Sequence, residues 1–151
     1  MKLTLIFFMS ILWANSAIGD SYDRKNFNYR SYKPNIAIGF YTGKTCDFIN
    51  IDHVVSLKDA YESGAANWSA SKKEAFANDR ANHVPSCGRV NSSKGSAVPK
   101  DFLRRSSDGK GLDYKIVLWC DYVSRYWAVK AAYQLSTENN DQKLLASCYK
   151  S

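Results

Sequence analysis

The spacing of hydrophobic positions changes along the chain, and the longest regular pattern is helical. Segment 112–135 carries large apolar side chains at helical spacing, at Ile116, Trp119, Val123, Trp127 and Tyr133. Such spacing places them together on one face of a helix. The segment therefore predicts a long helix whose apolar face packs on the core.

Segment 39–55 shows a shorter alternation of apolar and polar residues. Its sequence, GFYTGKTCDFINIDHVV, predicts two short strands joined by the turn-prone stretch TGKT. In the second strand, regular alternation places Ile49, Ile51 and His53 on one face and Phe48, Asn50 and Asp52 on the other. His53 then points away from Asp52, unless a bulge brings the two side chains together.

Capping signals predict the other helices. Ser56 can cap a helix through LKDAYESGA, and Ser71 with Glu74 three residues later forms a capping box for SKKEAFANDR. The stretch VNSSKGSAVPKDFLRR indicates a turn followed by a short helix. Thr137 can cap a last helix that ends near Cys148. Helices outnumber strands in this pattern, and the predicted fold class is α+β.

The length of 151 residues leaves room for one domain. The first 19 residues have the layout of a secretory signal peptide, with one lysine, an apolar stretch from Leu3 to Trp13, and small residues at Ala17 and Gly19. We therefore expect the mature domain to cover residues 20–151. The apolar stretch is too short to span a bilayer comfortably, and no later stretch is long enough. We expect no stable membrane insertion after cleavage; an uncleaved anchor is the alternative.

All four cysteines lie in the part that would be exported: Cys46, Cys87, Cys120 and Cys148. An even number in an oxidising compartment predicts two disulfides. Two helices joined by a short loop lie antiparallel, which favours a bridge from Cys120 to Cys148 and leaves Cys46 for Cys87. The sequence proves neither pairing. A zinc site is the rival interpretation, but the chain has no Cys-x-x-Cys pair to support it.

The formal net charge is +7, and it becomes +6 without residues 1–19, which contain Lys2 and no acidic residue. A basic domain of this size attracts polyanions, namely nucleic acid, anionic lipid or acidic polysaccharide. Basic residues surround the polar motifs in the sequence: Lys72, Lys73, Arg80, Arg89, Lys94, Lys100, Arg104 and Arg105. If they converge in space, they would bind phosphates without reading bases; otherwise they form a solvated face.

Three polar motifs could carry chemistry: DHVVSL at 52–57, FANDRANHV at 76–84 and VNSSKGS at 90–96. Taken singly they are ordinary, because a histidine is commonly a hydrogen-bonded structural residue and an asparagine a cap or turn residue. Their order is informative. A strand that ends in Asp-His, then an Asn, then a second Asn shortly before a Lys, matches the layout of HNH nucleases, whose core is the ββα-metal unit.

Segment 51–96 resembles the HNH-type nuclease domain found at the C-terminus of GmrSD restriction enzymes and in small secreted bacterial proteins. The pattern DHVV-L-DA-SGA-W, then FAND, then N-SKG covers about a third of the chain. The later CDYVSRYWAVKAAYQLS is similar to the closing helix of the family. The resemblance implies a small ββα-metal core with additional helices over residues 20–151, stapled by disulfides, and bacterial export to the periplasm or medium.

The resemblance also implies roles for single residues. His53 would be the general base that takes a proton from water, since the unperturbed pKa of histidine lies near neutrality. Asp52 and Asn91 would be oxygen ligands of one divalent cation, Mg²⁺ first, with Mn²⁺ or Ca²⁺ as alternatives. Asn82 holds the middle position of the motif and would fix the loop. Lys94 would meet a phosphate oxygen.

DNA would be the substrate, and the expected contacts with its backbone come from Arg80, Arg89, Lys100, Arg104 and Arg105. The chain departs from the family at His83, where relatives have an apolar residue, so His83 is a second-tier site residue. Two sequons occur, at Asn67 and Asn91. A glycan on Asn91 would block the site, which favours a bacterial source.

The leading interpretation is a secreted or periplasmic, metal-dependent DNA endonuclease with low sequence specificity, which nicks one strand or cuts both. The alternative is a catalytically silent, disulfide-stabilised module that binds nucleic acid or a cell surface. A pure binder would not need Asp52, His53, Asn91 and Lys94 together, which favours the nuclease. A toxin or phage-exclusion role would use the same chemistry, and the sequence shows neither role.

Overall fold

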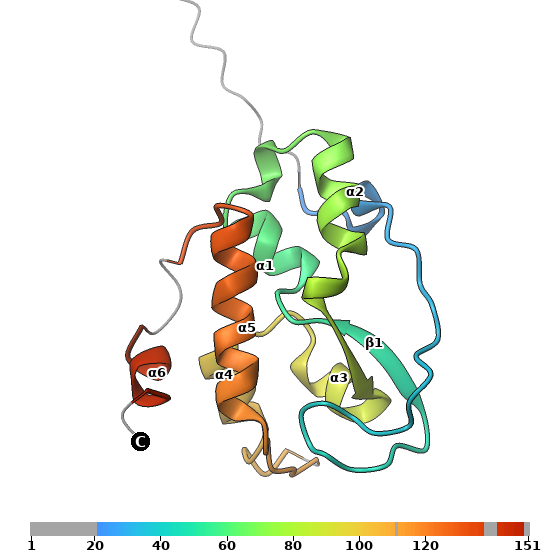
Figure 1. The fold of residues 1–151 in the computed structure, drawn as a ribbon, viewed down its shortest axis with the longest axis vertical. Helices are drawn as coiled ribbons and strands as arrows, with labels where there is room; N and C mark the ends of the chain where they lie inside the picture. Colours follow the sequence, from blue (N-terminus) through green and yellow to red (C-terminus); the bar gives the residue numbers. More distant parts are fainter. Residues whose placement is uncertain (1–20, 111, 138–141, 150–151) are drawn as a thin grey trace, which may run out of the picture.

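The computed structural model describes residues 21–110, 112–137 and 142–149 (Figure 1). The expected signal peptide therefore lies outside the described residues. Two antiparallel strands, β1 (Ile49–His53) and β2 (His83–Cys87), pair in a register that runs from Ile49 opposite Cys87 to His53 opposite His83. Helix α3 (Gly88–Lys94) follows β2 directly. The order β1, β2, α3 is the ββα unit that the resemblance implies.

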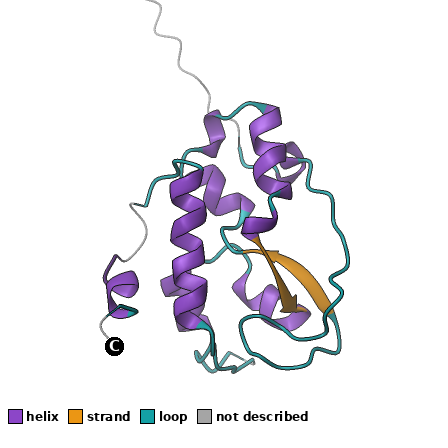
Figure 2. Cartoon of the chain, in the orientation of Figure 1, coloured by secondary structure: helices purple, strands orange, loops and turns teal. Residues whose placement is uncertain are grey.

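Helices lie on one side of this strand pair, and a long loop runs along the other side (Figure 2). The α-helices are α1 (Leu57–Glu62), α2 (Ala70–Asn78), α4 (Pro99–Arg105), α5 (Trp119–Ala132) and α6 (Gln142–Ser147), and the 3-10 turns are η1 (Arg24–Phe27), η2 (Ala65–Asn67) and η3 (Arg80–Asn82). Helix α5 runs between the strand pair with α3 on one side and α6 on the other (Figure 1). The α+β prediction is confirmed. No helix in the described ranges has the length and apolar character to cross a membrane.

Segment 39–55 contains one strand instead of the predicted two. The residues before β1 make only an isolated bridge, between Ile38 and Thr45, because the chain turns back tightly through Gly43. The Gly43 N–H donates to the Gly39 carbonyl over 2.9 Å. β1 therefore pairs with β2, about 30 residues further along the chain, and local alternation could not identify that partner.

The capping signals placed α1 and α2 to within a few residues, whereas the helix start predicted after Thr137 falls on residues 138–141, outside the described residues. The Ser56 hydroxyl accepts a hydrogen bond from the Asp59 N–H at the start of α1, as predicted. Helix α2 begins at Ala70, capped by Ser69 rather than Ser71, because Ser69 has extended backbone and accepts from the Lys72 N–H. Two helices, α3 and α4, stand where a turn and one short helix were predicted.

The buried face of α5 differs from the predicted apolar face. Ile116 lies before the helix and Trp119 and Trp127 are only partly buried. The fully or largely buried residues are Tyr122, Val123, Tyr126, Val129 and Lys130. Polar-tipped side chains occupy this face because their tips meet a buried carboxylate: the Tyr126 hydroxyl donates to Asp59 Oδ2 (2.5 Å) and Lys130 Nζ to Asp59 Oδ1 (2.7 Å).

Both favoured disulfide pairings are present. Cys46 bonds Cys87, which ties the loop before β1 to the end of β2, and Cys120 bonds Cys148, which ties α5 to the end of α6. Between these ties the core is rich in aromatic rings, with Tyr41 packed edge-on against Phe102 and Tyr122. This core supports the face of β1 that carries Asp52.

Candidate active site

Asp52 lies on the face of β1 that meets α3, and it is buried with a lysine. Its Oδ2 accepts a hydrogen bond from the Tyr41 hydroxyl (2.6 Å) and lies 3.0 Å from Lys94 Nζ. The Asp52 side chain is 7% exposed and the Lys94 side chain 0%. Lys94 Nζ also donates to the His53 carbonyl over 2.9 Å. A buried charge needs such a partner, because removal from water penalises each ion separately.

Lys94 is therefore too deeply buried to contact a phosphate at the surface. The sequence led us to expect this ammonium beside a phosphate oxygen, whereas in the structure it is inside the protein and neutralises Asp52. The α3 helix explains the position: Val90 and Lys94, one turn apart, are its two buried residues and both face the core. In this arrangement Lys94 is a structural partner of Asp52.

His53 occupies the opposite face of β1, so the regular alternation holds and no bulge joins it to Asp52. Its Nε2 lies 2.8 Å from the Ala77 carbonyl near the end of α2, and the Tyr29 ring packs edge-on against the imidazole. The side chain is nearly buried, at 4% exposure. The two neighbours in sequence therefore belong to different environments.

His83 shares the Ala77 carbonyl with His53. Its Nε2 lies 2.9 Å from that oxygen and 3.3 Å from His53 Nε2, and the Tyr32 hydroxyl lies 3.3 Å from His83 Nδ1. One assignment of hydrogens satisfies the contacts with the carbonyl and with Tyr32, and it leaves the two Nε2–H groups side by side without a hydrogen bond between them. Both rings carry their proton on Nε2 and donate to the two lone pairs of the carbonyl, while Tyr32 donates to His83 Nδ1. This assignment leaves the Nδ1 lone pair of His53 as a proton acceptor.

Burial keeps both imidazoles neutral. Desolvation lowers the pKa of His53 to about 3, outweighing the Ala77 carbonyl, which raises it. The pKa of His83 is lowered as well, again chiefly by burial. Two neutral rings with protons on Nε2 agree with the shared carbonyl. A neutral imidazole with an unprotonated nitrogen is the form in which a general base acts.

Asn82 fastens the chain where it leaves β1. Its Oδ1 accepts from the Val55 N–H (2.8 Å), its Nδ2 donates to the Val55 carbonyl (3.0 Å), and its own carbonyl accepts from the Val54 N–H (2.8 Å). The side chain is fully buried. Asn82 thus ties the segment after His53 to the segment before His83, which holds the two rings at the end of the strand pair.

Asn91 lies on α3, three residues before Lys94, and is partly buried. Its side-chain amide has no hydrogen-bond partner among the described residues, so its oxygen is available to a ligand. The part of the chain that the structure describes contains no group of three or more His, Cys, Asp or Glu side chains that could hold a metal ion. Asp52 and Asn91 are hard oxygen donors, and Lys94 already neutralises Asp52. Oxygen atoms of this kind are the ligands that a hard cation takes, but Asp52 is already paired with Lys94 and Tyr41, so the two residues do not form a preassembled cation site.

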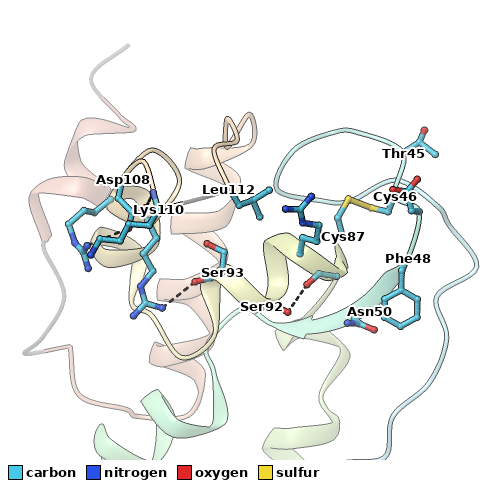
Figure 3. Close-up of a pocket in the computed structure, with 15 residues that line it drawn as sticks. Thr45, Cys46, Phe48, Asn50, Cys87, Ser92, Ser93, Asp108, Lys110 and Leu112 are labelled. Carbon is cyan, nitrogen blue, oxygen red and sulfur yellow. Dashed lines mark hydrogen bonds and ion pairs between the residues drawn. A yellow bond between two sulfur atoms is a disulfide. The ribbon is translucent and has the colours of Figure 1, made fainter.

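A basic groove runs along α3, with a volume of about 1210 Å³ (Figure 3). Its charged residues are Arg89, Arg104, Arg105, Lys110, Asp47 and Asp108. Asn50, on the same face of β1 as Asp52, and Ser92, next to Asn91, also line it. Asp52, His53 and Asn91 are not lining residues themselves. The groove adjoins the Asp52 side of the strand pair.

The predicted DNA contacts divide between separate places. Arg89, Arg104 and Arg105 lie in the basic groove, and Lys100 is exposed on α4 outside it. Arg80 lines a smaller pocket of about 480 Å³, where its guanidinium stacks 3.4 Å from the Tyr32 ring centroid beside His83. His83 lines this pocket and His53 does not.

Three tyrosines of the site were missed by sequence reasoning. Tyr41 bonds Asp52, Tyr29 packs on both histidines, and Tyr32 bonds His83. The only signal was the density of tyrosines between residues 22 and 41. Their contacts join residues that are 11 (Tyr41 and Asp52) to 54 (Tyr29 and His83) positions apart in the sequence, so no local pattern could assign them.

Comparison with known proteins gives one family and one curated relative. A family model described as "GmrSD restriction endonucleases, C-terminal domain" matches residues 13–148. An "Uncharacterized secreted protein" of Arthroderma benhamiae is 35% identical over 101 residues, which is 66% of this chain and 45% of the relative. The chain thus spans under half the length of that relative. No solved structure matches.

Proposed function

The chain belongs to the family of GmrSD restriction endonuclease C-terminal domains, and from that premise we propose that it is a metal-dependent DNA endonuclease of the HNH type. It hydrolyses phosphodiester bonds with low sequence specificity. The observation that carries this proposal is the ββα unit, with Asp52 and His53 at the end of β1 and Asn91 on α3. The basic groove beside the unit supports a polyanionic substrate.

His53 is the general base in this proposal. The Ala77 carbonyl fixes its Nε2–H, so Nδ1 is the atom that takes a proton from water. A base with a pKa of about 3 is weak on its own, because the buried imidazolium lacks a counter-charge. A phosphate bound beside the ring supplies that counter-charge and raises the pKa. The proposal thus requires that substrate binding raise the pKa of His53.

Asp52 and Asn91 would hold one divalent cation, with Mg²⁺ preferred over Mn²⁺ or Ca²⁺. When bound, such a cation stabilises negative charge on the phosphate and the leaving oxygen. Lys94 competes with it for Asp52. We therefore expect weak cation binding by the protein alone and tighter binding together with nucleic acid, whose phosphate adds ligands.

Arg89, Arg104 and Arg105 would contact backbone phosphates from the groove. We place the protein outside the cytoplasm, in the periplasm or medium after bacterial export. Two disulfides and a relative described as secreted support a location outside the cytoplasm, and neither bears on whether the exporting cell is bacterial.

A second function, the catalytically silent binding module, has two observations in its favour. The Asp52 carboxylate is already neutralised by Lys94, and the pKa of His53 is low, as in a protein that binds nucleic acid without cutting it. Incubation of the mature protein with supercoiled plasmid separates the two functions. The nuclease predicts nicked or linear product with Mg²⁺ or Mn²⁺ and none with EDTA. Intact plasmid in all three conditions, with retained binding, would establish the silent module.

Asn91→Ala tests the cation site within the same assay. The amide has no protein partner in the described residues, so the variant should fold normally. We expect it to cut more slowly than wild type at low Mn²⁺ and to recover as Mn²⁺ is raised. Ser92→Ala, one residue along α3 in the groove, is the matched control and should keep the wild-type Mn²⁺ dependence.

A further inference from the structure

An exposed phenylalanine stands at the edge of the basic groove. Phe48 is 67% exposed and lies in the loop between Cys46 and β1, and Figure 3 shows its ring projecting from that loop beside Asn50. Single exposed apolar residues are common on protein surfaces, so exposure alone carries little. What distinguishes Phe48 is the frame that holds it and the charges around it.

The backbone of Phe48 is fixed from three directions. The Cys46–Cys87 disulfide lies two residues before it, and Ile49, directly after it, pairs with Cys87 in the sheet. The Phe48 carbonyl accepts from the Gly88 N–H over 2.9 Å. The Phe48 ring packs directly on Gly88: a Cβ at position 88 would lie only 2.8 Å from Phe48 Cδ1, so a larger residue there would collide with the ring.

The groove beside this ring is positively charged. Arg89 follows Gly88, and Arg104, Arg105 and Lys110 approach from α4 and the segment after it. Arg105 is held by the Ser93 and Lys94 carbonyls (3.2 and 3.0 Å), which leaves its charge without a carboxylate partner in the described ranges. Arg89 and Lys110 form no ion pair among the described residues either. Arg104, by contrast, is ion-paired with Asp101 (3.5 Å) and Asp108 (3.9 Å). The groove thus combines a fixed aromatic face with three cations, Arg89, Arg105 and Lys110, that have no carboxylate partner among the described residues.

We propose that Phe48 stacks on the base of an unpaired nucleotide, so that the groove selects single-stranded nucleic acid. The arginines attract the phosphates of the strand, and the ring accepts a base of any identity because every base has an aromatic face. In a duplex, each base is stacked on its neighbours and offers no free face to the ring. This inference rests on the proposed function, since it names the substrate of the same groove.

Binding of a labelled single-stranded oligonucleotide and of its duplex, both in EDTA to prevent cleavage, tests the inference. Phe48→Leu keeps an apolar side chain on Gly88 but removes the ring, and it should weaken single-strand binding about 5- to 150-fold, as expected for loss of one base–aromatic stack. Duplex binding should stay within about twofold. Phe48→Trp keeps an aromatic ring and should bind the single strand about as well as wild type, which a purely structural role of Phe48 would not predict.

Tyr149→Leu is the matched control, because Tyr149 is a 71% exposed aromatic residue outside the groove. It should bind both probes as wild type does. Equal loss of both probes in Phe48→Leu, or unchanged single-strand binding, would overturn the inference. If the wild-type protein cuts plasmid and Phe48→Leu binds the single strand normally, the stacking role is rejected and the nuclease stands. If the wild-type protein does not cut plasmid and Phe48→Leu binds the single strand weakly, the nuclease proposal is rejected and the stacking role stands.

Discussion

Asp52 and His53 are neighbours in sequence, yet each is held by different partners on opposite faces of β1. Asp52 pairs with Lys94 and Tyr41, and His53 with the Ala77 carbonyl and His83. Replacement of either residue should therefore leave the environment of the other largely intact. The buried partners also make both residues important for stability, which activity measurements must take into account.

Lys94→Met should destabilise the protein strongly. It leaves the Asp52 carboxylate buried without its counter-ion, a change that typically costs about 3–5 kcal/mol. Urea unfolding monitored by circular dichroism measures this loss. Lys100→Met, on the exposed side of α4, is the control and should change stability little. The double variant Asp52→Asn, Lys94→Met should be more stable than Lys94→Met alone; if it is not, the pair is not coupled.

The histidine pair predicts how stability depends on pH. The pKa of His53 is lowered to about 3 in the folded protein from 6.5 when unfolded, so the unfolded state binds more protons between these values. The contribution of His53 to the free energy of unfolding should therefore be largest above about pH 6.5. It should fall as the pH drops below that value, by up to about 1.4 kcal/mol per pH unit. Below the folded pKa this loss stops.

Urea unfolding from pH 7.5 to pH 5 checks this, since carboxyl groups titrate mostly below that range. His53→Gln removes the titrating group and should show a shallower slope than wild type. A wild-type stability that is flat, or that rises toward pH 5, would contradict the buried neutral imidazole.

At the scale of elements, the sequence predicted helices better than strand pairing. A serine cap acts within one turn, so Ser56 located the start of α1. The partner of β1 lies beyond two helices, and alternation within 39–55 suggested a nearer one. The helical period of segment 112–135 was correct, but Tyr122, Tyr126 and Lys130 could not be assigned to its buried face without knowledge of Asp59.

In the candidate site, too, the sequence identified residues in local motifs but not their long-range contacts. The polar motifs brought His53, Asn82 and His83 to attention, and the structure places all three at one end of the strand pair. Burial of Lys94 was beyond sequence reasoning, because a lysine in a Ser-Lys-Gly stretch looks solvated. Its position depends on which face of a seven-residue helix meets the sheet.

The two disulfides should have similar effects on stability and different effects on binding. They close loops of similar size, with sequence separations of 41 and 28, so loss of either bridge should cost about 2–4 kcal/mol. Only Cys46 and Cys87 frame Phe48 and the groove. The double variant Cys46→Ser, Cys87→Ser should weaken single-strand binding, whereas Cys120→Ser, Cys148→Ser should not, when both are measured below their melting temperatures. Equal effects on binding would contradict this difference.

At the scale of the whole molecule, the positive charge is not spread evenly over possible binding surfaces. Arg89, Arg104, Arg105 and Lys110 gather in one groove beside α3, whereas Arg30 and Arg80 line the smaller pocket near His83. The strand pair separates the side of Asp52 from the side of His53. A nucleic acid that engages both sides must therefore pass the end of β1, where Asn82 fixes the chain.

Binding to the groove should depend on salt and not on sequence. Replacement of Arg104 and Arg105 with Ala removes two cations, so affinity for unrelated oligonucleotides should fall by similar factors and the slope of log K against log salt should flatten by about 2 or less. Fluorescence anisotropy between low and moderate salt measures both effects. Lys58→Ala, at an exposed position of α1 outside the groove, is the control. Strong preference for one short sequence would argue against this account.

The most direct test of the account is the plasmid-cleavage rate of His53→Ala beside that of wild type, with Mg²⁺ and with melting curves of both proteins. If the His53 Nδ1 takes the proton from water, the folded variant should cut about 10² to 10⁴ times more slowly while it binds DNA as well as wild type. A folded His53→Ala protein that cuts at the wild-type rate would remove His53 from the chemistry and contradict the proposed nuclease mechanism.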